Sequence, residues 1–231
     1  MIIAIAVVGG VAVFVTWRLV ARGKASVWVA VGLVEVAAAL AALVARAPPL
    51  SPRIAPGWTA LAGFGSGVAL YAATAAFVIT VRRWPVFDRH VAGIYDQRRG
   101  LPLFPAMALG ALIGCAEEIF WRGLVQGRLA SALGSGLGAL VTWLAWVFAL
   151  AASGSLPIVA GAVVGGAVWG GLALWTHGIL ASLVSHVVWT SLMVAVPPGG
   201  PQERSRHVGR VAKGPAAGRM GGSRGGSAER S

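Results

Sequence analysis

Long apolar stretches alternate with short polar breaks along most of this chain. Residues 1–17 and 57–81 contain no Asp, Glu, Lys or Arg, and none occurs between Leu129 and Gln202. A membrane-spanning helix needs about 20 predominantly apolar residues, because the hydrocarbon core of a bilayer is about 30 Å thick. The pattern predicts an all-α fold, a polytopic transmembrane helical bundle of about seven spans (six to eight). The predicted spans are 1–20, 26–46, 57–81, 101–121, 133–152, 156–175 and 178–197.

Composition supports this class. The chain of 231 residues is 57% hydrophobic and 11% charged, with a mean hydropathy of +0.78. Soluble domains carry about 25% charged residues, so this composition excludes an ordinary soluble protein. The single cysteine, Cys115, excludes an intrachain disulfide and a site built from several cysteines.

The formal net charge of +12 first suggests a nucleic-acid partner, but its distribution indicates membrane lipids instead. Most basic residues outside the C-terminal tail flank predicted spans, which fits the positive-inside bias and attraction to anionic lipid headgroups. We therefore predict no nucleic-acid binding, a multi-pass position in the cell membrane, an outside N-terminus and a cytoplasmic C-terminal tail. Seven of the 19 Lys and Arg lie in that tail: Arg204, Arg206, Arg210, Lys213, Arg219, Arg224 and Arg230.

The third loop has its own apolar periodicity. Trp84, Phe87, Val91 and Ile94 recur at helical spacing, which is typical of a short helix on the membrane surface. A plain connector between spans is the alternative.

An acidic pair, Glu117–Glu118, follows sixteen uncharged residues, 101–116. A charge at mid-membrane costs about 2.5–3.5 kcal/mol on insertion scales, so the pair calls for a reason. Arg122 lies four residues after Glu118 and can pair with it on a helix. Glu117 is rotated by about 100° from Glu118 and is expected to point elsewhere, free for proton or metal chemistry. The alternative is a charge cluster at the membrane interface that closes the fourth span.

The last span carries a second polar set. Ser182, His186 and Thr190 recur every four residues, so they share one helix face. Neutral imidazole binds metals and acts as an acid or base, although an intramembrane histidine can also simply hydrogen-bond to another helix. Glu35 stands alone in the second span and needs a partner or a polar cavity, while His177 lies at a turn between spans.

These residues resemble the motifs of a known family. Glu117-Glu118-x-x-x-Arg122 looks like the first motif of the CPBP family, the CAAX-protease and bacteriocin-processing membrane proteins also called the ABI family. His186, with Thr190 four residues later, is similar to the family's last motif, a His followed by Asn or Asp. The resemblance covers about 101–196.

The resemblance implies a domain organisation and a set of roles. Residues 101–197 would be the CAAX-protease-like region, and 1–100 would hold N-terminal transmembrane helices and a cytoplasmic loop. The composition of 198–231, rich in Gly, Ser, Pro and Arg, predicts a basic disordered tail. Glu117 would activate water, with Glu118, Arg122 and Thr190 supporting it. His186 would act as an oxyanion partner or, with Glu117, as a ligand of a divalent metal, zinc being the first choice.

The chain departs from the family pattern at two places. A family histidine falls at Leu150 or Ala152, neither of which binds metal or moves a proton, and the final Asn or Asp is Thr190. Catalytic zinc usually has three protein ligands. The third is missing unless Glu118, His177 or Glu35 supplies it.

The leading hypothesis is therefore an intramembrane metalloendopeptidase that hydrolyses a peptide or membrane-protein substrate near the membrane with a Glu-activated water. One alternative is a catalytically impaired family member that acts as a membrane binding or immunity-type protein. A second is a small proton-coupled transporter using Glu35, Glu117 and His186, against which the lack of an internal repeat counts.

Overall fold

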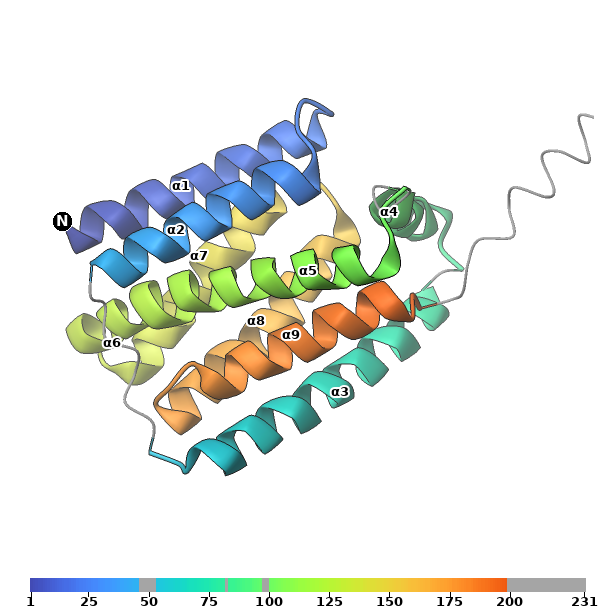
Figure 1. Ribbon diagram of the computed structural model, residues 1–231. Coiled ribbons are helices and arrows are strands. Elements are labelled where there is room, and N and C mark those ends of the chain that lie inside the picture. The colour runs from blue at the N-terminus through green and yellow to red at the C-terminus, as the bar shows by residue number, and fades with distance from the viewer. Residues whose placement is uncertain (46–52, 82, 97–99, 199–231) are drawn as a thin grey trace, which may run out of the picture. The chain divides into compact units, whose positions relative to one another are not determined.

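A computed structural model describes residues 1–45, 53–81, 83–96 and 100–198 (Figure 1). No β-strand occurs in this part of the chain, which is helical apart from caps and connections. In order, its elements are α1 (Ile2–Ala21), η1 (Val27–Val31), α2 (Gly32–Val44), α3 (Pro56–Val81), α4 (Pro85–Asp96), α5 (Leu103–Glu117), η2 (Glu118–Gln126), α6 (Gly127–Leu133), α7 (Ser135–Ala151), α8 (Leu156–Thr176) and α9 (Leu180–Ala195), where η marks π-helix.

The apolar helices confirm the predicted helical membrane bundle. Within the described residues, five are long and apolar enough to cross a membrane, and α7 and α9 are shorter apolar helices. The chain is thus a multi-pass membrane protein. The fourth span was predicted too short, at 101–121, because it continues as one helix from Leu103 to Leu133. The predicted tail, 198–231, lies outside the described residues except for Pro198.

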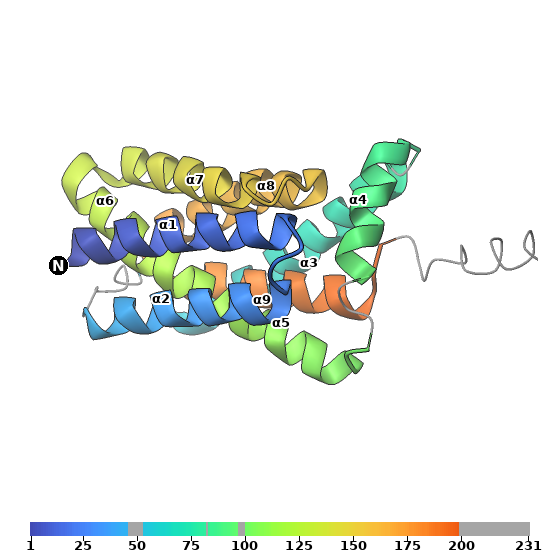
Figure 2. The same cartoon turned by 90° about the horizontal axis from the view of Figure 1, so that it is seen from above.

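The helices of residues 1–198 surround η2. Consecutive contacts join α1 to α2, α2 to α5, α5 to α9, α9 to α8, α8 to α7 and α7 back to α1. The segment η2 contacts each of these six helices. Figure 2 gives the same arrangement from a second direction, with α7 and α8 on one side of α1 and with α2 and α5 on the other. Any polar side chain on η2 therefore faces protein rather than lipid.

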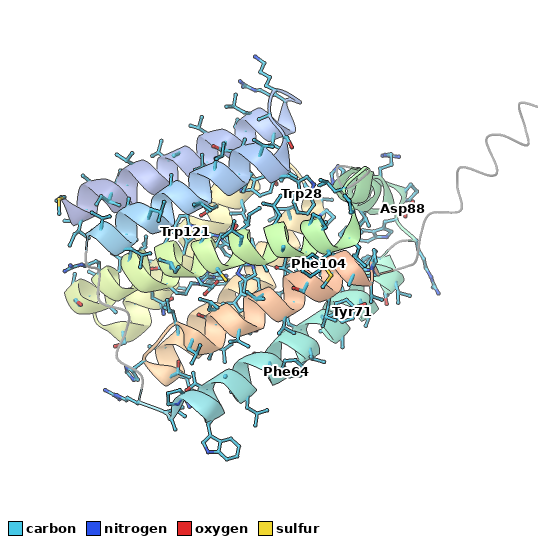
Figure 3. All side chains as sticks on the ribbon, in the orientation of Figure 1. Trp28, Phe64, Tyr71, Asp88, Phe104 and Trp121 are labelled. Carbon is cyan, nitrogen blue, oxygen red and sulfur yellow. The ribbon has the colours of Figure 1, made fainter. Side chains whose placement is uncertain are left out.

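Helix α3 lies outside this ring and packs along α9. A Cβ built on Gly63 would lie 2.6 Å from the backbone oxygen of Ala181, and one on Gly67 would lie 2.7 Å from that of Ser185. The two glycines thus permit direct backbone contact between the helices, as small residues commonly do in membranes. Figure 3 shows the contrast in side-chain position, with Trp121 inside the bundle and Phe64 on the outer side of α3.

The helix predicted in the third loop is present as α4. Phe87 and Val91 are buried against Val78 of α3, while Trp84 just before the helix is exposed. The backbone N–H of Leu156 donates to His90 Nδ1 at 3.2 Å, which ties α4 to the beginning of α8. The plain-connector alternative is wrong, because this segment is a helix whose apolar face packs against α3.

Candidate active site

The acidic pair lies in the interior of the long fourth helix. Glu117 ends α5 and Glu118 begins η2, and the helix continues to Leu133. Glu118 is fully buried and Glu117 is 6% exposed. The acidic pair is therefore enclosed by protein and does not end the helix. The local π-helix adds to the argument, because π-helical turns inside α-helices are frequent at functional sites.

The predicted pair of Glu118 and Arg122 is confirmed. Arg122 Nη1 lies 3.2 Å from Glu118 Oε1, and both side chains are buried. Arg122 Nη2 also donates to the carbonyl oxygen of Gly166 at 3.5 Å, and its guanidinium lies 4.5 Å from the ring centroid of Trp146. A buried ion pair needs such additional contacts to offset the desolvation of both charges.

Both acidic side chains reach the same histidine. His186 Nδ1 lies 3.0 Å from Glu118 Oε1, and His186 Nε2 lies 3.7 Å from Glu117 Oε2. The prediction that Glu117 points elsewhere is wrong. Two flexible carboxyl side chains on neighbouring residues can approach opposite edges of one imidazole when α9 packs directly on α5, as it does here.

This arrangement selects one tautomer of neutral His186. An ionised carboxylate only accepts hydrogen bonds, and Glu118 is held next to the Arg122 guanidinium. His186 Nδ1 must therefore carry the hydrogen and donate to Glu118, which leaves the lone pair of Nε2 directed toward Glu117. Orientation of one ring nitrogen by a bond to the other is how proteins usually fix histidine chemistry.

An aromatic ring packs on one face of the His186 imidazole. Trp169 of α8 stacks on the imidazole with ring centroids 3.6 Å apart, and its indole N–H donates to Ser185 Oγ at 3.2 Å. Trp146 of α7 packs edge-on against Trp169. Neither tryptophan was among the predicted site residues. A signal was present, because Trp169 is the one bulky aromatic residue in the glycine-rich stretch 161–171.

The glycines of α8 make room for these rings. A Cβ on Gly166 would lie 2.7 Å from Trp146, and one on Gly165 would lie 2.9 Å from Trp169. The backbone at these glycines is also accessible to polar side chains of η2. Gln126 Nε2 donates to the carbonyl oxygen of Gly170 at 3.1 Å. The glycine face thus carries indole rings and accepts hydrogen bonds from η2.

The remaining predicted residues lie at different distances from this centre. Ser182 is fully buried beside Glu118, and its hydroxyl donates to the carbonyl oxygen of Ile179. Thr190 is half-buried, and its methyl group faces Gly110 of α5. His177 caps the end of α8 with a left-handed backbone, φ 54°, in agreement with its predicted turn position.

Helix α7 brings no ionisable group to the site. Leu150 and Ala152, the two positions for the family histidine, are buried in the main apolar core. In the described part of the chain, no three His, Cys, Asp or Glu residues form a group that could hold a metal ion. The donor set therefore does not fit a zinc site with three protein ligands. The metal stays a prediction with two candidate ligands, Glu117 and His186.

Glu35 joins the site from α2. It is fully buried, and its carboxyl group interacts electrostatically with Glu117 and Arg122. Glu35 was predicted to need a partner or a polar cavity, and in the structure it lies near Glu117 and Arg122.

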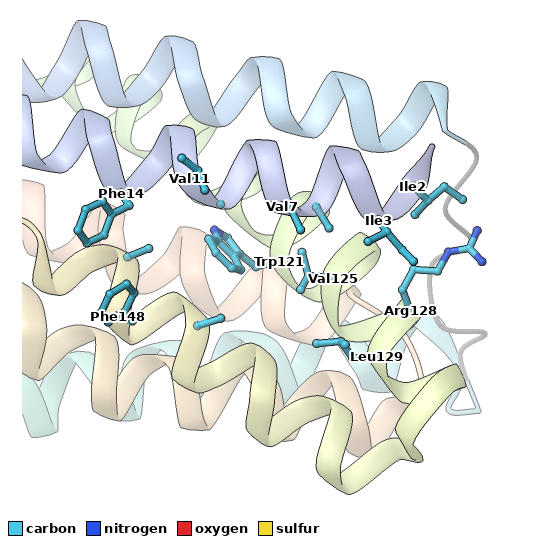
Figure 4. Close-up of a pocket in the computed structure, with 14 residues that line it drawn as sticks. Ile2, Ile3, Val7, Val11, Phe14, Trp121, Val125, Arg128, Leu129 and Phe148 are labelled. Carbon is cyan, nitrogen blue, oxygen red and sulfur yellow. The ribbon is translucent and has the colours of Figure 1, made fainter.

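An apolar pocket of about 450 Å³ adjoins the site (Figure 4). Its walls come from α1, η2, α6 and α7 and include Trp121, Phe148 and Ala149, while Arg128 is the one charged residue that lines it. Trp121 is shared between the pocket and the surroundings of Glu35. The pocket is large enough for a small hydrophobic ligand.

Comparison with known families fits this geometry. Residues 99–192 match the family model described as Type II CAAX prenyl endopeptidase Rce1-like. The match includes Glu117, Glu118, Arg122, His186 and Thr190.

Residues 99–192 form a CAAX-protease-family domain.

No curated protein and no solved structure gives a significant match to the chain. The CAAX-protease domain indicates a protease of the membrane whose substrates are peptides or membrane proteins. Within the domain, the two family motifs meet where the junction of α5 and η2 packs against α9, and Glu35 comes from a helix outside the domain.

Proposed function

We propose that this protein is an intramembrane endopeptidase in which Glu117 activates the attacking water. One observation carries the proposal: Glu117 Oε2 and His186 Nε2 face one another at 3.7 Å in a buried site. The oxygen of an ionised Glu117 and the Nε2 of the His186 tautomer described above are both hydrogen-bond acceptors, so a water between them can donate one hydrogen to each. Its oxygen lone pair is then directed away from the two acceptors and toward a substrate carbonyl.

The hydrolysis follows from these groups. The water oxygen forms a bond to the carbonyl carbon as Glu117 takes one of the water protons. The C–N bond then breaks, and the proton on Glu117 passes to the departing amine nitrogen. The net change is one water added across one peptide bond, and Glu117 ends ionised as it began. Proton transfer by a positioned side chain is worth about 10²–10⁴-fold in rate.

The groups behind His186 support this role. Glu118 accepts from His186 Nδ1 and is itself held by Arg122, so the imidazole keeps its orientation. Stacking on Trp169 restricts rotation of the ring. We derive no step through a metal, because the donor set does not offer three ligands.

The impaired-member alternative rests on α7. Leu150 and Ala152 put apolar side chains where the family has a histidine, so the chain lacks one polar group of the family site. A protein that binds membrane peptides without cutting them would use the same buried centre. A protease cleaves the bound peptide and the impaired member does not, so one cleavage assay distinguishes the two functions.

The decisive experiment measures cleavage of membrane-tethered peptides by the purified full chain in liposomes. We expect Glu117→Gln to lower the rate at least about 10²-fold, because Gln cannot accept the water proton. The matched control is Glu203→Gln, the same chemical change outside the family-matched residues. Binding of peptide without cleavage by the wild-type chain would overturn the protease and favour the impaired member, and metal analysis of the same preparation tests the zinc prediction.

The substrate class can be tested in the same liposomes. We propose that the peptide carries a prenyl chain, since the family description names prenyl substrates and an apolar pocket adjoins the site. The rate on a prenylated peptide should exceed the rate on the same peptide without the chain. Ala145→Trp, which puts a bulky ring into the pocket, should reduce this preference. Equal rates on the two peptides would contradict the proposed substrate class.

We also propose that the end of the bundle that carries α4 and the basic α1–α2 connection faces the cytoplasm. The connection between α1 and α2, which contains Arg22 and Lys24, lies at the same end of the bundle as α4 (Figure 2). Cytoplasmic loops carry an excess of Lys and Arg. Labelling of single cysteines introduced at Lys24 and Gly134 from each side of intact cells tests the orientation.

A further inference from the structure

Glu35 is the least satisfied acidic group of the described residues. Its side chain is fully buried, and neither carboxyl oxygen has a hydrogen-bond partner among them. The indole N–H of Trp121 interacts with this carboxyl group, but the two groups do not reach hydrogen-bond geometry. Glu118, in contrast, pairs with both Arg122 and His186.

Such a group is unfavourable for folding. A buried polar group without a compensating partner loses its hydration and gains little in return, and the loss is larger for a carboxylate. An apolar side chain of similar size on α2 would pack against the same neighbours without that loss. The bundle therefore gains no stability from having Glu at this position.

The place of Glu35 in the fold supplies a reason for it. Helix α2 packs against both α5 and η2, and Gly32, one turn before Glu35, faces Ile113, one turn before Glu117. The two glutamates are therefore at matching heights on neighbouring helices, close enough for the charge of one to act on the other. Glu35 bounds the acidic site on the side of α2, while His186 bounds it on the side of α9.

We propose that Glu35 is a positioning residue of the Glu117 site. Its carboxyl group restricts the Glu117 carboxyl group to the side facing His186 Nε2, by electrostatic repulsion and by occupying the α2 side of the site. This inference deepens the proposed function and rests on it for the catalytic consequence. It also assigns a residue outside the 99–192 domain to the active site.

The proposal predicts opposite changes in stability and turnover. Glu35→Leu removes the unpartnered carboxyl group, so we expect the apparent Tm to rise by about 2–4 °C. We expect kcat on the tethered peptide to fall at least about tenfold with little change in KM, because Glu117 loses its alignment but the peptide contacts remain. Glu35→Gln, which keeps size and polarity, should restore part of kcat.

Leu40→Ala, an exposed position on the same helix, is the matched control and should leave kcat unchanged. A fall in Tm together with kcat would mean that Glu35 is a structural residue, and an unchanged kcat would remove it from the site. Either result overturns the proposal.

A stability cycle separates this inference from the proposed function. Apparent Tm values of Glu35→Leu, Glu117→Leu and the double variant measure their coupling without any assay of cleavage. Non-additive shifts support contact between the two carboxyl groups even if the wild-type chain cuts no peptide, in which case the protease proposal alone fails. Additive shifts overturn the role of Glu35.

Discussion

Two long helices of this protein have similar apolar sequences but opposite surroundings. The helix from Leu103 to Leu133 and helix α3 both pass the length and hydropathy criteria for a membrane span. The first is surrounded through η2 by five other helices, α1, α2, α7, α8 and α9, whereas α3 packs mainly along α9. The polar side chains Glu118, Arg122 and Gln126 are all buried on the first. The comparison shows that a central position, rather than low hydrophobicity, permits charged chemistry in a membrane helix.

The largest effect should come from the central ion pair. Glu118→Ala leaves the Arg122 guanidinium buried without a carboxylate and removes the acceptor of His186 Nδ1. We expect a loss of about 3–5 kcal/mol in the free energy of unfolding, measured by denaturant titration in mild detergent.

The control for that loss replaces both charges. Glu118→Leu combined with Arg122→Met leaves no unpaired charge, so most of the stability should return. If the double variant were as unstable as the single one, the damage would come from packing and not from an unpaired charge.

One substitution made on both helices compares their surroundings directly. Phe120 of η2 is fully buried, and Phe64 of α3 is 54% exposed. We expect Phe120→Ala to lower the free energy of unfolding by about 3–5 kcal/mol, and Phe64→Ala to change it by no more than about 0.5 kcal/mol. Unfolding titrations of the two variants side by side give the measurement. Equal losses would contradict the peripheral position of α3.

A smaller effect should come from one of the close contacts between α3 and α9. A Cβ on Gly63 meets the backbone oxygen of Ala181, while one on Gly65 meets nothing within 4 Å. Gly63→Ala should lower the free energy of unfolding by about 1–3 kcal/mol through overpacking. Gly65→Ala should raise it by about 0.5–1 kcal/mol, because alanine favours helix. Similar results for the two variants would argue against close packing of α3 on α9.

The sequence predicted the parts of the molecule that depend on local spacing. Apolar runs located the helices, because bilayer thickness sets their length. The separation of four residues predicted the contact between Glu118 and Arg122, because helix geometry fixes it. The fourth span was predicted to end at Trp121, before Arg122 and Gln126. The helix continues through both residues, and each donates a hydrogen bond to a carbonyl oxygen of α8.

Contacts that depend on packing between helices distant in the sequence could not be predicted from spacing along the chain. Whether Glu117 faces His186 depends on how closely α9 approaches α5, and Gly110 and Gly114 on α5 permit that approach. No spacing along the chain encodes the stack of Trp169 on His186, because the two residues come from different helices. Glu35 was recognised as needing a partner, but its neighbour Glu117 lies 82 positions later in the sequence.

The π-helical geometry of η2 makes the site sensitive to chain length as well as to composition. A π-helix pairs each N–H with a carbonyl five residues away, one more than in an α-helix. Deletion of one residue between Glu118 and Gln126 would let this stretch return to α-helical pairing while α5 and α6 keep their neighbours. Arg122 and Gln126 would then turn away from Gly166 and Gly170, whose carbonyls they now bind. A one-residue deletion that spares Arg122 would thus break the contacts of Arg122 and Gln126, although every motif residue would still be present in the sequence.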